Sequence, residues 1–366
     1  MADYRFLVGS AAFWEVARAD IAAARRRVLV QAMTFEADAA GRGVAEAVEA
    51  SGAADRRVLV DDYSRHVIND HVVAATRKRA IVNEARDTRA MFAALVARGV
   101  GVRVTNPIGR NPARYAVRNH KKLIVADDVA YIGGINFSDH NFAWHDMMIR
   151  VAVRDAVDFL AADFDATWAS RPVAAQARFG DVSLYALDGR YNATSFADTF
   201  AALAAARTSI DVVSAYPTFP FVDALAAAAR RGVRVRIFTP LPNNKAVVRD
   251  YVVPAAQAAG IEVRLLPEMT HLKAMLIDAE RLIAGSCNFD FASWHVEEEF
   301  LAILDDPALA ADFHAAVIAP AEASAHPAGY WHPTAWQAWK ARAALRVADT
   351  AVRAMRGTRR CAVDWS

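Results

Sequence analysis

The chain of 366 residues is poor in cysteine and has no long apolar run. Its cysteines, Cys287 and Cys361, form no C-x-x-C pair and no cluster with histidine, which argues against a zinc site or a structural disulfide. No stretch approaches the roughly 18 to 20 apolar residues that a membrane-spanning helix needs. The first residues also lack the pattern of an export signal. These absences predict a soluble, cytoplasmic protein that uses no metal and no other cofactor.

A large charge of one sign is absent too, because 43 basic residues face 41 acidic ones, for a net charge of +2. Proteins that bind nucleic acid usually carry a marked basic excess, so this composition favours that class of partner only weakly. Lysine is scarce, with six of the 43 basic positions. A position that takes lysine rather than arginine therefore indicates a need for a compact ammonium group.

One short pattern, H-x-K-x4-D, occurs twice. Each copy is followed by small residues and an asparagine. The first copy comprises His120, Lys122, Asp127, Gly133, Gly134 and Asn136, and the second comprises His271, Lys273, Asp278, Gly285, Ser286 and Asn288. Both copies take the rare lysine, and the duplication predicts one active site built from two halves.

The flanking sequence repeats as well. Residues 21–35 match 203–217, and residues 98–107 resemble 259–268. Alanine-rich helical segments alternate with short β-branched runs, which is typical of α/β layers with a largely buried sheet and helices on its faces. We therefore expect a first repeat over 1–172, a second over 181–325 and a separate tail over 326–366. About 30 extra residues in the first half are expected within 65–98.

The motif has a direct chemical interpretation. Alternation along a strand places the histidine and the lysine on one face, whereas the aspartate closes the strand and should hold a turn. The asparagines can donate to an anionic oxygen, and the glycines allow close approach of the backbone. Asn136, Asn288, Gly134 and Ser286 are therefore the expected substrate-binding positions. Two imidazoles, two ammonium groups and two amides around one pocket suit a phosphodiester. One imidazole would attack phosphorus while the other transfers protons, without a metal.

Each imidazole also needs a group that fixes its orientation. Asp146 and Glu299 are the candidates, since each opens a β-like run shortly after its asparagine. The carboxylate of the second repeat is defined only to within one position, because Glu297, Glu298 and Glu299 are consecutive. A strand would put Glu297 and Glu299 on one face and Glu298 on the other.

The segments RNHKKLIVADDVAYIGGINFSDH and HLKAMLIDAERLIAGSCNFDFAS resemble the two motif blocks of the phospholipase D superfamily, and most of all bacterial cardiolipin synthases that lack transmembrane helices. The resemblance covers roughly residues 20–305. It implies a duplicated α/β fold with mixed sheets, packed by pseudo-twofold symmetry around one active site. It also implies that His120 is the nucleophile and His271 the acid. Phosphate-binding roles follow for Lys122, Lys273, Asn136 and Asn288, and histidine-orienting roles for Asp146 and Glu299.

The expected activity is transfer of a phosphatidyl group between glycerophospholipids, with phosphatidylglycerol or phosphatidylethanolamine as substrate. Water as the acceptor would make the enzyme a phospholipase D. A nuclease of the same superfamily is the alternative from another substrate class, and an inactive scaffold is disfavoured because both motifs are whole. Duplication removes the need for a dimer to complete the site, so a monomeric active site is expected.

The tail combines tryptophans with arginines. Trp336 and Trp339 open a stretch that also carries Arg342, Arg346 and Arg353, a composition typical of a helix lying at a membrane interface. A helix that docks on the domain by its apolar side is the alternative, and the two are compatible. The expectation is peripheral association with anionic membranes. Histidines outside the motifs, including His140, His145 and His295, are expected to serve packing or substrate contact.

Overall fold

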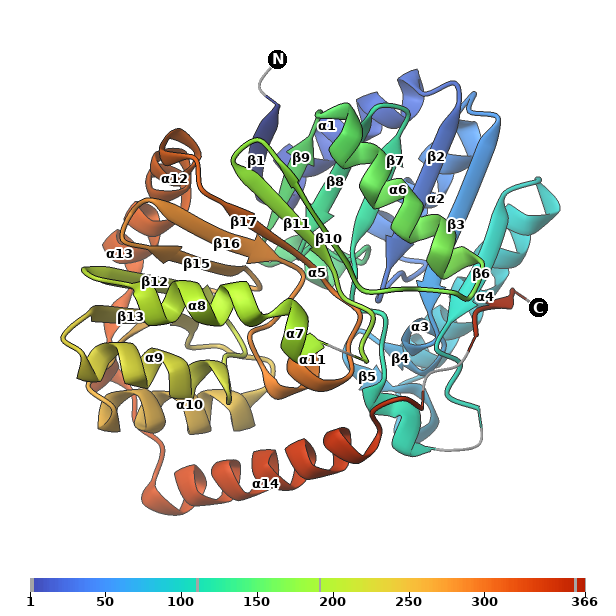
Figure 1. The fold of residues 1–366 in the computed structure, drawn as a ribbon. Helices are drawn as coiled ribbons and strands as arrows, with labels where there is room; N and C mark the ends of the chain where they lie inside the picture. Colours follow the sequence, from blue (N-terminus) through green and yellow to red (C-terminus); the bar gives the residue numbers. More distant parts are fainter. Residues whose placement is uncertain (1–2, 110–111, 191, 359–360, 366) are drawn as a thin grey trace. The chain divides into compact units, whose positions relative to one another are not determined.

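The computed structural model describes residues 3–109, 112–190, 192–358 and 361–365. The chain divides into two compact units, one formed by Met1–Val173 with Thr358–Ser366 and the other by Ala174–Gly357. Each unit is an α/β structure built on one mixed sheet (Figure 1).

The first unit holds a sheet in which β2, β3 and β6 are parallel and the other neighbours are antiparallel. Its β-branched strands are buried on both faces, as expected for strands covered by helices. The strand order is β1 (Tyr4–Val8), β9 (Met147–Val151), β8 (Val129–Gly133), β7 (Leu123–Ala126), β2 (Arg27–Ala32), β3 (Asp55–Asp61), β6 (Gly101–Thr105) and β19 (Val363–Asp364).

The second unit repeats this order strand for strand and adds β10 at one edge. Its parallel strands are β12, β13 and β14. The order is β10 (Ala175–Phe179), β11 (Val182–Ala186), β17 (Phe300–Leu304), β16 (Arg281–Gly285), β15 (Lys273–Ile277), β12 (Ser209–Ser214), β13 (Arg234–Pro240), β14 (Glu262–Leu266) and β18 (His326–Pro327). The expected duplication with mixed sheets is therefore confirmed.

Helices cover the sheet of the first unit. Phe13, Ala17 and Ile21 recur at four-residue spacing on α1 and are buried, so one stripe of that helix faces the core. Figure 1 shows α6 crossing the opposite face from α1 and α2. The helices are α1 (Ser10–Ala23), α2 (Ala39–Ala50), α3 (Tyr63–His66), α4 (Arg79–Ala97), α5 (Asp139–Ala143) and α6 (Arg154–Trp168), with the short elements β4 (Val67–Ile68), β5 (His71–Val72), η1 (Val73–Ala75) and η2 (Pro112–Ala116).

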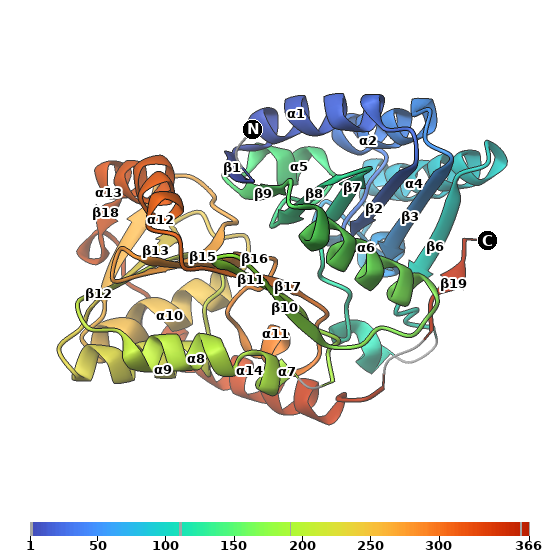
Figure 2. The ribbon, with the colours of Figure 1, turned by 45° about the horizontal axis from the view of Figure 1, so that its top comes forward.

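In the second unit α8, α9 and α10 lie on one side of the sheet and α12 and α13 on the other (Figure 2). Leu225, Ala228 and Val222 form the buried stripe of α9. The helices are α7 (Asn192–Ser195), α8 (Ala197–Ala205), α9 (Phe221–Arg230), α10 (Ala246–Ala258), α11 (Phe291–His295), α12 (Pro307–Phe313), the π-helix η3 (His314–Ile318), α13 (Ala319–Ser324), η4 (Ala328–Tyr330) and α14 (Ala335–Ala354).

The extra residues of the first half occupy two places. Between β3 and β6 the chain forms α3, β4, β5, η1 and α4, whereas the matching part of the second unit, between β13 and β14, holds α10. This agrees only in part with the expectation that all the extra residues lie within 65–98. A second insertion precedes the first motif, where residues 106–122 join β6 to β7 and only 267–272 join β14 to β15.

The last part of the chain divides between the units. Helix α14 packs against α10 and α11 of the second unit through Leu345 and Val352. Strand β19 pairs with β6 of the first unit, where Trp365 lies 4.5 Å from Phe92 between ring centroids. Among the helices that the structure describes, none is long and apolar enough to cross a membrane.

The aspartates of the two motifs hold the start of a neighbouring strand. Asp127 accepts backbone N–H groups of Arg25, Arg26 and Arg27 at 2.8 to 3.0 Å, where β2 begins. Asp278 does the same for residues 207–209 before β12, at 2.8 to 3.2 Å. Both aspartates have positive φ, 50° and 54°, a conformation that aspartate tolerates better than most residues. These contacts are those of a turn.

The Asp278 turn makes stability depend on pH. Partial burial opposes ionisation, but hydrogen bonds from Ser209, Thr208 and Arg207 outweigh it and lower the pKa of Asp278 to about 2. D278N should therefore reduce the free energy of unfolding by about 1–2 kcal/mol above pH 5, since charge-assisted bonds to an accessible group are lost. The contribution exists above the unfolded pKa of 3.8 and disappears as pH falls toward 2, so the two proteins should converge in acid. Urea titrations at pH 7, 5, 4 and 3 measure this, and a difference that does not vary with pH would contradict it.

Candidate active site

The first H-x-K motif lies directly before β7. His120 and Lys122 are buried, and Lys122 Nζ donates to the carbonyl oxygen of His120 at 2.7 Å. Lys121, between them, points to α6 instead, where its Nζ lies 2.7 Å from both carboxylate oxygens of Asp163. Alternation thus places the motif histidine and lysine together, away from their neighbour.

The residues before His120 are tied to the carboxyl end of β3. Asn119 N donates to Asp61 at 2.7 Å, and Arg118 pairs with the same carboxylate at 2.5 Å. Gln31 of β2 donates to Asn119 Oδ1 at 2.8 Å. Buried bonds to two strands therefore fix the backbone that carries the imidazole.

The second unit repeats the arrangement. His271 and Lys273 precede and open β15, and Lys273 Nζ donates to the carbonyl oxygen of His271. Tyr216 lies edge-on to the His271 ring at 5.7 Å between centroids, and Lys245 Nζ sits 4.3 Å from the centre of the Tyr216 ring. In the sequence, Tyr216 aligns with Thr34 of the first repeat, within the matched segments 21–35 and 203–217. That alignment was the only signal that could have pointed to it.

Asn136 follows β8 and is held from two sides. Thr34 N donates to its Oδ1 at 3.1 Å, and its Nδ2 donates to Asn141 Oδ1 at 3.4 Å. Beside it, a Cβ on Gly134 would lie 2.3 Å from a carboxylate oxygen of Asp146. Glycine is thus required at 134 for the Asp146 carboxylate to take its place.

In the second unit a serine and a longer acid replace the glycine and the aspartate. Met148 pairs with Gly133 and Leu301 with Gly285, so Asp146 and Glu299 hold equivalent positions. The Glu299 carboxylate accepts the hydroxyls of Ser286 and, at 2.7 Å, Ser293. By position Glu299, rather than its neighbours, is the counterpart of Asp146. Asn288 is buried next to this cluster, with its N–H 3.3 Å from Ser293 Oγ.

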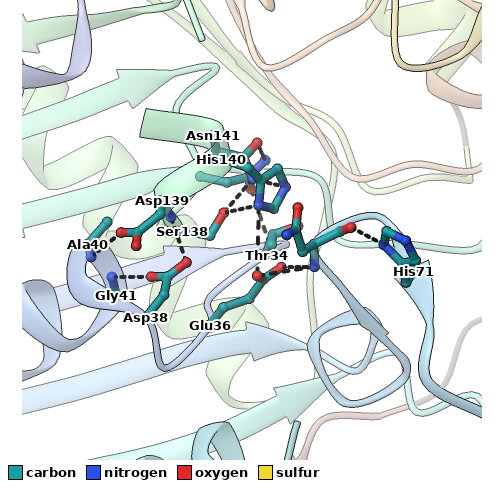
Figure 3. A network of polar contacts seen from close by, with 12 residues as sticks. Thr34, Glu36, Asp38, Ala40, Gly41, His71, Ser138, Asp139, His140 and Asn141 are labelled. Carbon is teal, nitrogen blue, oxygen red and sulfur yellow. Dashed lines mark hydrogen bonds and ion pairs between the residues drawn. The ribbon is translucent and has the colours of Figure 1, made fainter. Parts of the chain in front are cut away.

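A polar network that sequence reasoning missed surrounds α5 (Figure 3). It joins Glu36 to His140 and to Asn141, which contacts Asn136. His140 had only a general expectation of packing or substrate contact. Glu36 lay outside both motif blocks, so no spacing rule pointed to it.

Carboxylates gather at the edge of this network. Oxygens of Glu36, Asp38 and Glu84 lie within 4.8 Å of one another, a geometry in which they could hold a cation. Burial raises the pKa of Glu36 to about 8, although the Asn69 N–H opposes this, and burial raises the pKa of Glu84 as well. Protons can therefore relieve their repulsion at neutral pH.

Two other polar residues have structural contacts. His295 Nε2 lies 2.9 Å from Asp349 Oδ1, and this contact fastens α11 to α14. Arg356 contacts the other ring nitrogen of His295, Nδ1. Cys287 is fully buried, and burial raises the pKa of its thiol well above the ordinary value. A neutral, enclosed thiol is a poor nucleophile.

Each unit carries one mixed sheet and one copy of the motif, and this fold can be compared with solved structures. The chain resembles the crystal structure of phosphatidylserine synthase from Haemophilus influenzae Rd KW20, with a TM-score of 0.73, 14% identity, and coverage of 96% of this chain and 94% of that one. A polyphosphate kinase from Porphyromonas gingivalis shares the fold, with a TM-score of 0.57, 14% identity and coverage of 95% and 55%. The fold is the duplicated phospholipase D-like fold.

The family follows from the sequence. The family model described as "Cardiolipin synthase, PLD-like domain" matches residues 17–168 and 200–318, and the chain belongs to this family. It is 29% identical over 222 residues to minor cardiolipin synthase ClsB of Bacillus subtilis (strain 168), covering 55% of each protein. It is 27% identical to cardiolipin synthase A of Pseudomonas syringae pv. syringae (strain B728a), covering 77% of this chain and 61% of that protein. The chain thus spans little more than half the length of these curated relatives.

Adjacent glycines allow the site to be separated from the fold. A Cβ at Gly133 would lie 2.3 Å from the Met147 carbonyl oxygen, so G133A should disrupt the β8–β9 pairing and cost about 1–3 kcal/mol of stability. The three atoms nearest to a Cβ at Gly134 all belong to the Asp146 carboxyl group, the end of a side chain that can move more easily than backbone. If the motifs act on a phosphodiester, as the sequence predicts, G134A should lower turnover by about tenfold or more with a smaller loss of stability.

Thermal unfolding and turnover of a soluble phosphodiester measure the two effects. S286A is the matched control, because it removes the hydroxyl that Glu299 accepts and adds no atom. It should reduce turnover without a steric cost. Full activity of G134A would mean that the position of the Asp146 carboxylate is unimportant.

Proposed function

We propose that this protein is a phosphatidyltransferase that moves a phosphatidyl group between glycerophospholipids through a phosphohistidine, giving cardiolipin or a related product. The observation that carries the proposal is the same motif geometry in both units, with each lysine ammonium bonded to the carbonyl of its own histidine. The family match, which covers a large part of both units, supports it. Phosphatidylglycerol and phosphatidylethanolamine are the substrates to test.

In the proposed reaction His120 is the nucleophile. Its imidazole nitrogen attacks phosphorus, a P–N bond forms, and the P–O bond to the headgroup breaks. His271 gives a proton to the leaving alkoxide. The neutral His271 then takes a proton from the hydroxyl of the acceptor, whose oxygen attacks phosphorus and breaks the P–N bond. Water in place of that alcohol would give hydrolysis.

The charge on the phosphoryl oxygens needs electrostatic stabilisation. Lys122 and Lys273 supply ammonium groups, and Asn136 and Asn288 supply amide N–H groups, in the role that metal ions play in many other phosphoryl-transfer enzymes. Asp146 and Glu299 orient the imidazoles in this proposal. Asp127 and Asp278 act by holding strands β2 and β12.

The surface of α14 supports a lipid substrate and peripheral membrane binding. The indole rings of Trp336 and Trp339 stack at 4.9 Å between centroids and are about 60% exposed, and Val347 is 71% exposed on the same helix. Lys340 and Arg342 are exposed nearby. Solvent-exposed tryptophans beside basic residues suit an anionic bilayer surface.

The mechanism predicts distinct defects for the two histidines. H120A should abolish turnover with the fold intact, because no covalent intermediate can form. H271A should lower turnover by roughly 10²- to 10⁴-fold and accumulate the phosphohistidine. Wild-type activity should persist in EDTA. Product analysis with labelled phosphatidylglycerol, phosphatidylethanolamine and single-stranded DNA, all with EDTA present, measures these outcomes.

Several results would count against the mechanism. Acid-labile phosphate on a residue other than His120 would reverse the assignment of the nucleophile. Loss of activity in EDTA that Mg²⁺ or Zn²⁺ restores would remove the metal-independent mechanism. Cleavage of DNA with no lipid product would replace the substrate class. The exposed residue His314 offers a matched control, since H314A should retain full activity.

The membrane surface can be tested without disturbing the fold. Removing the whole tail is unsuitable, because Trp365 is packed in the first unit and Leu345 in the second. The double substitution W336S/W339S alters exposed side chains only. It should weaken binding to phosphatidylglycerol vesicles about tenfold or more, since each indole loses an apolar contact.

Flotation with vesicles and turnover of a short-chain soluble phosphodiester are the two measurements. Only the first should change. V82S on α4, also at an exposed apolar residue, is the control and should bind vesicles normally. Unchanged binding by W336S/W339S would place the lipid-facing surface elsewhere, and equal loss on both measurements would mean a structural role for the tryptophans.

A further inference from the structure

A row of polar side chains leads away from Asn136 through α5 to Glu36, and Figure 3 shows its part from Asn141 and His140 to Glu36. Asn136 donates to Asn141 at 3.4 Å, Asn141 Nδ2 lies 2.8 Å from His140 Nε2, and His140 Nδ1 lies 3.8 Å from Glu36 Oε2. All of these side chains except His140 are at most 4% exposed, and the His140 side chain is 16% exposed. In such surroundings each donor must meet an acceptor.

Helix α5 is held firmly against the start of α2. Asp38 caps α2 by accepting from Gly41 N at 3.0 Å, and its other oxygen accepts from Asp139 N at 2.6 Å. The Asp139 carboxylate in turn accepts from Ala40 N at 2.8 Å. These reciprocal bonds leave His140 and Asn141 little freedom to shift.

The donors and acceptors have a fixed order along the chain. Asn141 Nδ2 donates to Ser138 Oγ at 2.6 Å and to His140 Nε2. These two bonds turn the Oδ1 atom of Asn141 toward Asn136. Asn136 Oδ1 is taken by Thr34 N. One N–H of the Asn136 amide is thereby used, and the other is set for an anionic oxygen.

This order requires a neutral His140 with its proton on Nδ1. Burial lowers the pKa of His140, although Asp70 and Asp139 oppose the shift. Glu36 also faces the ring, with its Oε2 3.8 Å from Nδ1. The Nδ1 proton can then be donated to Ser138 Oγ at 3.1 Å, which leaves the Nε2 lone pair for Asn141.

We propose that His140 is a positioning residue, which fixes the sense of the Asn141 amide and thereby presents an N–H of Asn136 to the substrate phosphate. Without the acceptor at His140 Nε2, the Asn141 amide could turn over and set its NH₂ against that of Asn136. Two opposed donors would repel, and Asn136 would lose its orientation. This inference rests on the phosphate-binding role proposed for Asn136.

The second unit solves the same problem differently. Ala292 and Ser293 stand where the first unit has His140 and Asn141. There Ser293 Oγ reaches the carboxylate of Glu299 at 2.7 Å. Asp146 has one methylene fewer and lies against Gly134, so the first unit holds its asparagine through a histidine instead.

A double-mutant cycle tests the proposal. H140A should lower kcat about tenfold with little change in KM, less than the roughly 10²-fold expected for loss of the Asn136 donor itself. In the N136A background H140A should have no further effect beyond about twofold. In N141D both terminal atoms of residue 141 are oxygens, so no orientation of this side chain sets a donor against the Asn136 amide. H140A should therefore change kcat little in the N141D background as well.

The assays use the full chain with phosphatidylglycerol and with bis(4-nitrophenyl) phosphate, plus calorimetric binding of orthovanadate as an inert phosphate mimic. H140A should weaken vanadate binding in the wild-type background but not in N136A. Equal losses from H140A in all backgrounds, or no loss at all, would overturn the proposal. Thermal unfolding shows whether H140A, which also removes an edge contact with Trp144 at 5.1 Å, still folds. If H140A does not fold, the activities of N141L and N141D are compared instead. Only N141L removes the oxygen that accepts from Asn136, so N141L should be the less active of the two. Equal activity of N141L and N141D would overturn the proposal. A wild type that acts on neither substrate would instead refute the proposed function.

Discussion

The bond from each motif lysine to the carbonyl oxygen of its own histidine is the constraint on which the motif geometry of each unit depends. Lys122 and Lys273 are at most 2% exposed, and a buried ammonium group must be hydrogen-bonded. Bonding to the residue two positions earlier satisfies part of that need and holds the ammonium beside the imidazole. The same bond in both units is consistent with lysine in the motif of a chain whose other basic residues are mostly arginine, because a planar, forked guanidinium would not reach this carbonyl in the same way.

Around this shared element the units diverge in how they hold the remaining groups. In the first unit, glycine at 134 makes room for a short aspartate, and Asn136 is held through α5. In the second, Ser286 and Ser293 donate to the longer Glu299. Each acid thus matches its neighbours: the shorter Asp146 lies against Gly134, and the longer Glu299 carboxylate reaches the hydroxyls of Ser286 and Ser293. Exchange of one member alone would therefore be expected to harm either half.

The tail joins two properties in one helix. Its buried side carries Leu345, Val352 and the Asp349 carboxylate that binds His295, and its exposed side carries the stacked tryptophans. Docking and membrane contact do not compete, because they use different faces. The two alternatives that composition left open for this segment are therefore compatible in the structure, with docking on the second unit observed and membrane binding proposed.

The sequence by itself determined the duplication, through the repeated motif, and the α/β class, through the alternation of helical and β-branched segments; the mixed sheets followed from the resemblance to the phospholipase D superfamily. The local geometry of each motif follows from spacing along a strand. Alternation pairs His120 with Lys122 and turns Lys121 to the other face, and an aspartate at the strand end can reach only the nearby turn. Tertiary structure alone decided the network of Glu36, His140 and Asn141, because it joins segments about a hundred residues apart. It also decided the exposed face of α14 and the return of Trp365 to the first unit. Such contacts depend on packing between distant elements, for which a single sequence carries no periodic signal.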